Sequence, residues 1–330
     1  ISKFSFIVVI LLASSCFFFS KISSIALLFV AIFLMRFSGQ GMMSHTATTT
    51  ISRYFTKSRG KALSTAWFGL SSAEFILPVL MIYLLTITKW QNIWITISIL
   101  IIVVLPILSW SLIKNLNFDS REIISDEKFK NKNIKSWNRI EVIKDYRFYI
   151  ICGNMLAMPW IATGTFVYQS FILQSKNWGQ YIIAQSFMVY SILSVITLFA
   201  AGYLIDKFTS RKLIIYMNIP LLISVFVLIL FNHEISAFIF LGLIGISNGL
   251  ANVLGSSTWA EIYGVKYIGA IKALTTSLMV FATAFGTALF GLLIDKGLNI
   301  EKIALISAIY ISISLLSLLI IRKKLNPKYL

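Results

Sequence analysis

The sequence predicts an all-α integral membrane fold, and three observations support that fold class. Hydrophobic residues make up 58% of the chain and charged residues 12%, and the mean hydropathy is +0.86. A soluble domain carries about twice that charged fraction, so lipid has to solvate much of this surface. The apolar residues also lie in continuous runs of roughly the 20 residues that a spanning helix needs, not in the alternating pattern of β-barrel strands.

Ten apolar runs are separated by polar breaks, so we expect about ten membrane-spanning helices. They cover residues 4–20, 24–50, 62–86, 91–113, 148–172, 179–203, 212–231, 236–259, 270–293 and 302–321. One connection alone is long, and it divides the spans into four and six. We therefore expect two helical units, residues 1–114 and 148–330, joined by a polar loop at residues 115–147.

The basic residues favour one side of the membrane. Of the 29 lysines and arginines, 23 fall in segments on one side, five fall on the other, and Arg36 lies within a span. Because positively charged loops stay in the cytoplasm, this bias predicts a multi-pass plasma (inner) membrane protein with both ends of the chain cytoplasmic. Topology and attraction to anionic lipid headgroups account for the net charge of +17, so we expect the lipid bilayer, and no nucleic acid, as a partner.

Neither a metal nor a cofactor is expected. Cys16 and Cys152 lie inside apolar runs, and His45 and His233 are far apart in the sequence. The chain has no P-loop, so it is not expected to be an ATP-driven pump. An intramembrane enzyme would need a nucleophile with a base at the same depth, or an H-E-x-x-H metal motif, and neither pattern occurs.

Two charged residues fall near the middle of predicted spans, Arg36 in the second and Glu74 in the third. Both are expected near the bilayer midplane, where a charge costs about 2.5–3.5 kcal/mol and usually faces a cavity or a partner. Arg36 can then anchor an anionic solute and Glu74 can exchange protons; the alternative is a buried structural ion pair. Gln40 shares the helix face of Arg36, whereas His45 lies on the opposite face and is expected to pack.

Two polar stripes are further candidates for a transport pathway. Asn154, Thr165 and Gln169 share one face of the fifth span, where Pro159 is expected to cause a kink. Asn248 and Asn252 share a face of the eighth span among several glycines. Such stripes either line a pathway or form interhelical hydrogen bonds beside small-residue packing surfaces.

The segment after the sixth span reads GYLIDKFTSRK (202–212). It resembles the G-x-x-x-D-[RK]-x-G-x-[RK]-[RK] signature of the major facilitator superfamily, with Thr209 in place of the usual glycine. In that family the motif lies on the cytoplasmic side between helices eight and nine, where it biases a gate. The gating residues that the resemblance implies are Gly202, Asp206, Lys207, Arg211 and Lys212.

The same resemblance sets the register of the whole chain. The first predicted span corresponds to the family's third helix, so we expect a fragment that holds ten of twelve helices and lacks the first two. RFSGQG (36–41) is similar to the family's R-x-x-x-G-x-G pattern, and residues 36–78 resemble bacterial monocarboxylate and oxalate/formate-type carriers. The resemblance implies two pseudo-symmetric helical bundles that alternate access around a midplane site.

We therefore expect a monomeric secondary active transporter for a small solute. Arg36 favours an organic anion such as a carboxylate, and Glu74 favours protons as the coupling ion. The alternatives are a non-transporting sensor or receptor on a carrier fold, which would usually bring a soluble output domain, and an intramembrane enzyme.

Overall fold

The structure, a computed structural model, describes residues 2–55, 59–113, 135–179 and 182–326. Within these ranges it is built from helices and contains no strand. Eight helical segments of the described residues are long and apolar enough to cross a membrane, and Phe4–Ser20 is a shorter apolar helix. The eight coincide with predicted spans. The remaining predicted span corresponds to α4 (Arg59–Ile87), whose 29 residues would extend for roughly 43 Å. The prediction of an all-α membrane fold is confirmed.

The helices fall into two halves along the chain. The first half contains α1 (Ser2–Ser20), α2 (Ile25–Met35), the π-helix η1 (Arg36–Met43), α3 (Ser44–Tyr54), α4 and α5 (Trp90–Ile113). The second half contains α7 (Arg139–Ile143), α8 (Tyr146–Val167), α9 (Gln169–Lys176), α10 (Ile182–Phe208), α11 (Ser210–Leu213), the 3-10 turn η2 (Ile214–Tyr216), α12 (Ile219–Leu230), α13 (Glu234–Tyr263), α14 (Ile268–Asp295), α15 (Ile300–Ile321) and the 3-10 turn η3 (Arg322–Lys324).

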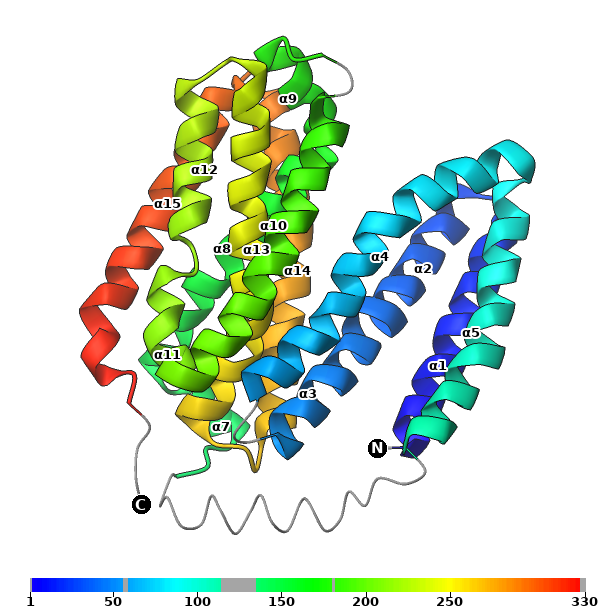
Figure 1. The fold of residues 1–330 in the computed structure, drawn as a ribbon, viewed down its shortest axis with the longest axis horizontal. Coiled ribbons are helices and arrows are strands. Elements are labelled where there is room, and N and C mark those ends of the chain that lie inside the picture. Colours follow the sequence, from blue (N-terminus) through cyan, green and yellow to red (C-terminus); the bar gives the residue numbers. More distant parts are fainter. Residues whose placement is uncertain (1, 56–58, 114–134, 180–181, 327–330) are drawn as a thin grey trace.

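The two halves form a V in Figure 1. We call the end where α1 begins and α15 ends the terminal end, and the opposite end the far end. At the terminal end, α3 and the start of α4 pack against α10, α13 and α14. Toward the far end α2 and α4 tilt away from the second half, and α1 and α5 pair with each other on the outer side. The halves are therefore joined mainly at one end.

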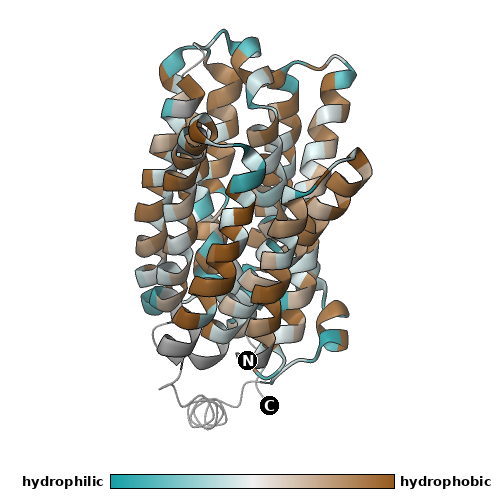
Figure 2. Ribbon diagram, turned by 90° about the vertical axis from the view of Figure 1, so that its right-hand side faces the viewer, coloured by the Kyte–Doolittle hydropathy of each residue, from teal (hydrophilic) through white to brown (hydrophobic). Residues whose placement is uncertain are grey.

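Apolar residues run along the helices, and polar residues gather near the helix ends. Figure 2 shows hydrophobic residues along the lengths of the helices and hydrophilic residues concentrated near several of their ends.

Inside the second half, α10 and α13 approach closely at Gly245 and Gly249, where a Cβ atom would collide with the carbonyl oxygens of Tyr190 and Ser194. Small residues that let backbones approach are typical of helix packing in lipid, where no hydrophobic force acts between helices.

Three predicted spans are less regular than their sequences suggest. The second span contains the π-helix η1, and the seventh is broken by η2 and Asn218. The fifth span is interrupted at Tyr168, nine residues beyond Pro159, which lies inside α8. The kink expected at Pro159 stays a prediction. A proline inside a spanning helix is tolerated when neighbouring helices satisfy the freed backbone groups. The end of the expected loop also contains the short helix α7, which begins with the capping box of Asn138 and Glu141.

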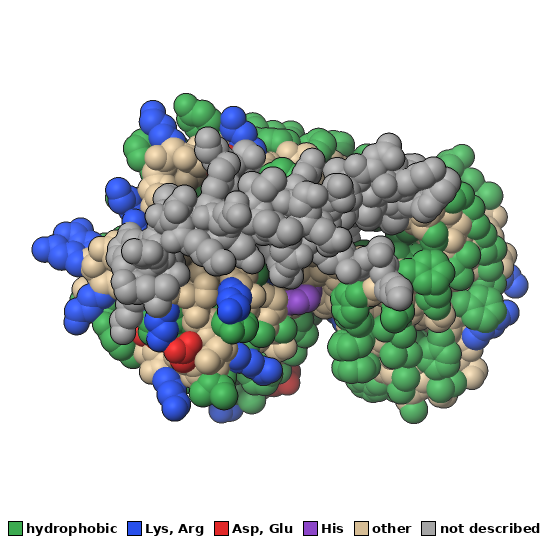
Figure 3. Space-filling model, turned by 90° about the horizontal axis from the view of Figure 1, so that it is seen from below, with side chains coloured by type: hydrophobic (Ala, Val, Ile, Leu, Met, Phe, Trp, Pro, Cys, Tyr) green, Lys and Arg blue, Asp and Glu red, His purple; other side chains and the backbone are tan. Residues whose placement is uncertain are grey.

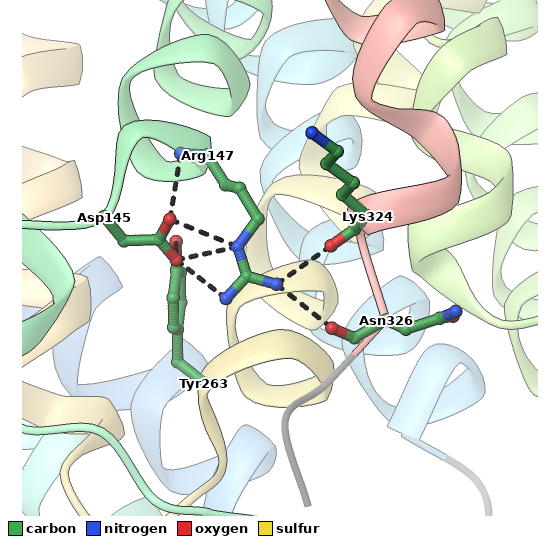
Figure 4. Close-up of polar contacts among 5 residues, drawn as sticks. All are labelled: Asp145, Arg147, Tyr263, Lys324 and Asn326. Atoms are coloured by element: carbon green, nitrogen blue, oxygen red, sulfur yellow. Dashed lines mark hydrogen bonds and ion pairs between the residues drawn. The ribbon is translucent and has the colours of Figure 1, made fainter.

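A buried ion pair anchors the chain's last described residues at the terminal end. The Nε and Nη2 atoms of Arg147 each lie 2.8 Å from Oδ2 of Asp145, and both side chains are only 6% exposed. The Tyr263 hydroxyl donates to the same oxygen at 3.1 Å. Nη1 of Arg147 donates to the carbonyl oxygens of Lys324 and Asn326 at 2.9 and 3.0 Å. Figure 4 shows how this guanidinium ties the start of α8 to the end of α13 and to the C-terminal segment.

Replacing Arg147 with methionine should lower the free energy of unfolding by about 3–5 kcal/mol, because it leaves the Asp145 carboxylate buried without its partner. The double variant Asp145→Asn with Arg147→Met should lose less, since no uncompensated charge remains. Thermal unfolding in detergent micelles measures both. Arg322→Met is the matched control, because Arg322 is exposed. Equal melting of Arg147→Met and the control would contradict this account.

Candidate functional site

Arg36 opens the π-helix η1 in the second span, and its side chain is exposed. Its Nη1 donates to Oε1 of Gln40 at 2.9 Å, so the predicted shared face is present. Among the described side chains Gln40 is the residue that Arg36 hydrogen-bonds, and it uses one of the five guanidinium N–H groups. The alternative of a structural ion pair between Arg36 and Glu74 stays a prediction. π-helical segments are frequent at functional sites.

Glu74 lies on α4, but its side chain falls outside the described residues. Its backbone position is in the middle of α4. The expected common depth of Arg36 and Glu74 therefore remains a prediction.

The stripe on the fifth span lies largely inside the second half. Asn154 is fully buried and Thr165 is 4% exposed. The Asn154 carbonyl oxygen accepts a hydrogen bond from Nδ2 of Asn218 at 2.6 Å, a contact between helices. Gln169, just beyond the break at Tyr168, is half-buried. Asn154 and Gln169 thus belong to separate helical segments.

On α13, Asn248 donates from Nδ2 to the hydroxyl of Ser194 on α10 at 3.1 Å. Asn252 lies one turn further along α13 and is half-buried. The contact of Asn248 is of the interhelical kind that the sequence left open as an alternative to a pathway.

The motif at residues 202–212 reaches across to the first half. Oδ1 of Asp206 accepts a hydrogen bond from the backbone N–H of Gly60 at 2.9 Å, and Oδ2 accepts one from the N–H of Lys61 at 3.2 Å. These are among the first N–H groups of α4, which have no partner within their own helix. A carboxylate there also meets the positive end of the helix dipole. Asp206 therefore caps a helix of the opposite half.

Two glycines make this contact possible. A Cβ on Gly60 would collide with the carbonyl oxygen of Gly202, and a Cβ on Gly202 would lie 2.6 Å from the hydroxyl oxygen of Ser64. α4 and α10 therefore touch backbone to backbone beside Asp206. The sequence motif predicted Gly202 and Asp206, but it did not identify Gly60 as their counterpart.

A second carboxylate, Glu261 on α13, caps the next helix start. Its Oε1 and Oε2 accept hydrogen bonds from the N–H groups of Ser210 and Arg211 at 2.9 and 3.2 Å. Thr209, directly before α11, has φ +75° and ψ 142°, a backbone conformation that favours glycine. The residue that departs from the family motif thus occupies a strained position that the motif's glycine would adopt freely.

The basic residues of the motif point in different directions. Arg211 donates from Nη1 to Oδ1 of Asn326 at 2.9 Å, which fixes the C-terminal segment. Nζ of Lys207 lies 5.3 Å from the ring centre of Phe208, and both Lys207 and Lys212 are exposed. Only Asp206 and Gly202, of the five predicted gating residues, have a described contact with the other half.

Lys272 on α14 makes a second bridge between the halves, which the sequence analysis missed. Its side chain is 3% exposed, and Nζ donates to the carbonyl oxygen of Thr48 at 2.8 Å and to Oγ of Ser52 at 2.7 Å. Both acceptors lie in the last turns of α3, where the helix dipole favours a cation. In the sequence, Lys272 counts among the 23 basic residues that fall on one side of the membrane. It lies just after the start of α14, where the positive end of the helix dipole disfavours a cation. This unfavourable position could have indicated that Lys272 binds an acceptor from another helix.

His45 lies in the first turn of α3, before the residues that Lys272 contacts, and is half-buried. Its Nδ1 is buried and makes no hydrogen bond to the described residues. The packing role expected of His45 stays a prediction. No group of three or more metal-ligating side chains occurs among the described residues.

Long apolar helices, arranged in two halves that meet at one end through polar contacts and an apolar cluster around Leu63 and Leu198, define a multi-pass membrane protein of the carrier type. A family model of the Major Facilitator Superfamily matches residues 2–287, and the chain belongs to this superfamily. A search of the curated proteins found no match. The family consists generally of transporters that carry small solutes across membranes and not of enzymes, so the chain is a membrane transporter.

Replacing Thr209 with glycine should raise the free energy of unfolding by about 1 kcal/mol, because relief of backbone strain outweighs the entropy cost of glycine. Thr209→Ala keeps a Cβ at the same φ and should give no such gain. Thermal unfolding of the two variants in detergent tests this directly. A stabilisation shared by alanine and glycine would assign the effect to the threonine side chain and not to the backbone.

Proposed function

We propose that this transporter is a secondary carrier that works by alternating access, in the state closed at the terminal end. The observation that carries this proposal is the pair of polar bridges between the halves, Asp206 to the start of α4 and Lys272 to the end of α3. Both lie at the terminal end, and the halves diverge toward the far end (Figure 1). Breaking these bridges while closing the far end would expose a central site to the opposite side.

The closed end faces the cytoplasm in this proposal, and the membrane is the plasma (inner) membrane. Figure 3 looks at the terminal end and shows lysine and arginine side chains gathered around the second half, with hydrophobic side chains dominating the outer part of the first half. Basic residues concentrate on the cytoplasmic side of membrane proteins. The described state is then open to the outside.

The bridges have the strength that a gate needs. A side-chain cap on a helix start contributes about 0.5–2 kcal/mol, and a hydrogen bond to a charged group about 1.5–3 kcal/mol. Two bridges of this size bias the equilibrium by a few kcal/mol, and an energy gap of that order leaves the alternative state accessible.

Arg36 supports an organic anion as the solute class. Its guanidinium is exposed and hydrogen-bonds Gln40 through one nitrogen, so a planar fork of N–H groups is left for a carboxylate, which arginine binds in bidentate geometry. Gln40 holds the guanidinium in place from one turn further along the π-helix. The solute would then bind on the second span, within the first half.

Protons are the proposed coupling ion because Glu74 is the one acidic residue that the sequence places deep within a span. A carboxylate in the bilayer interior is costly when charged and readily takes up a proton when its surroundings are apolar. Proton coupling therefore needs at least one carboxylate in the bilayer interior, and we assign this role to Glu74.

Uptake into proteoliposomes tests the solute and the coupling together. We expect an imposed pH gradient to drive uptake of a carboxylate from a panel that also contains neutral and cationic solutes. Arg36→Ala should lower that uptake at least about tenfold, as expected for loss of a charge-assisted hydrogen bond worth ~1.5–3 kcal/mol. Glu74→Gln should abolish the response to the gradient. Lys21→Ala, which removes a cation at the far end, is the control.

Uptake of a carboxylate that survives in Arg36→Ala would disprove the anion assignment and leave the carrier standing. Uptake that ignores the gradient in the unmodified protein would disprove proton coupling. Failure to move any solute of the panel would count against all of these assignments.

The gate can be tested separately from transport. Asp206→Asn and Lys272→Met should each shift the population toward separated halves at the terminal end, because each removes a charge that bridges them. Electron–electron distances between spin labels at Phe4 and Lys266, both exposed, should lengthen in a Cys16→Ala, Cys152→Ala background. Asp295→Asn neutralises an exposed carboxylate at the far end and is the control. Unchanged distance distributions in both gate variants would rule out this gate.

A further inference from the structure

An apolar groove of about 380 Å³ lies on the surface of the second half, between α10, α12 and α13. Its walls include Ala201 and Leu204 of α10, Tyr216 and Ile219 beside the break of the seventh span, and Leu250 of α13. The volume is within the roughly 300–1,000 Å³ of small-molecule sites. The lining side chains are apolar apart from the hydroxyl of Tyr216, so the groove suits a hydrocarbon and not the polar solute of a transport pathway.

The groove exists because the backbone of the seventh span turns inward. Met217 and Asn218 are fully buried. The Met217 carbonyl oxygen accepts a hydrogen bond from the Ser247 hydroxyl at 2.7 Å, and Nδ2 of Asn218 donates to the Asn154 carbonyl oxygen at 2.6 Å. These bonds hold the broken segment against the core of the half. A hollow is left on the outer side.

The groove opens outward, toward the bilayer. Tyr216 is 59% exposed and Ile219 is 39% exposed, although both belong to its wall. A surface of a multi-pass protein that exposes isoleucine and tyrosine between spanning helices faces lipid. The occupant of such a groove is therefore an acyl chain.

Cationic side chains flank the groove on the side of the terminal end. Lys207 lies three residues beyond Leu204 on α10, so it shares the helix face that lines the groove, about one turn nearer the terminal end. Lys212 lies four residues before Tyr216 in the other wall. Both lysines are exposed. A lipid whose acyl chain fills the groove has its headgroup at the level of these two ammonium groups.

We propose that this groove binds one phospholipid with an anionic headgroup, the acyl chain lying against Leu204 and Ile219 and the phosphate between Lys207 and Lys212. The site differs from general attraction of lipids to the basic end because it needs both the hollow and the two lysines beside it. It also does not depend on which solute the carrier moves.

Native mass spectrometry of the full chain tests the site. The protein is delipidated and offered equal amounts of phosphatidylglycerol and phosphatidylcholine with the same acyl chains. We expect one retained phosphatidylglycerol, preferred over phosphatidylcholine, and a preference lowered roughly tenfold in Lys207→Gln with Lys212→Gln, since each lysine near an anionic headgroup contributes to affinity. Leu204→Trp fills the groove and should remove retention of that lipid.

The matched control is Arg322→Gln with Lys323→Gln, which removes two exposed cations at the same end away from the groove. Retention of phosphatidylglycerol should survive in this control. An equal loss in both double variants would show diffuse attraction and overturn the site, as would unchanged retention in Leu204→Trp. Equal retention of the two lipids by the unmodified protein would overturn the anionic preference. Melting temperatures of all variants establish that each is folded.

Discussion

The arrangement of the two halves depends on one carboxylate that caps a helix start in the other half. Every helix begins with N–H groups that no backbone carbonyl of the same helix can satisfy. α4 meets this constraint through Asp206, 146 positions away in the sequence. The close approach of Gly60 and Gly202 follows from it, because a carboxylate on α10 can reach those N–H groups only when the backbones touch.

Several helix starts of the second half are capped from within their own segment, unlike the start of α4. Asn138, Asp145 and Asn299 each accept a hydrogen bond from an N–H two or three residues further along their own segment, so those helix starts are encoded locally. α4 and α11 instead receive Asp206 and Glu261 from other helices. A helix start whose cap comes from elsewhere is satisfied in one arrangement of the helices and not in another, and that dependence couples local hydrogen bonding to the positions of the halves.

This difference decides what could be predicted from the sequence. Hydrophobic runs predicted the spans because apolar length is a local property, and the motif predicted Asp206 because its residues are adjacent in the chain. The capped N–H groups of α4 have no local sequence signature, and Lys272 looked like one more loop cation. The helix break at Tyr168 could not be predicted either, because the residue is neither a proline nor a glycine. At the candidate solute site, sequence spacing correctly paired Arg36 with Gln40, but it could not show that the intervening turns are π-helical.

The polar bridges matter for function because lipid makes apolar packing nearly neutral between conformations. A leucine that leaves another helix finds acyl chains of similar character, so little free energy distinguishes the two states at apolar positions. The N–H groups of α4 and the ammonium of Lys272 need hydrogen-bond acceptors, and water at the terminal end has to replace the acceptors that the other half provides. In the alternating-access cycle that we propose, the equilibrium between states is therefore set by a few polar groups at the terminal end. A carrier can combine stable halves with a movable boundary between them only if these two tasks fall to different kinds of contact.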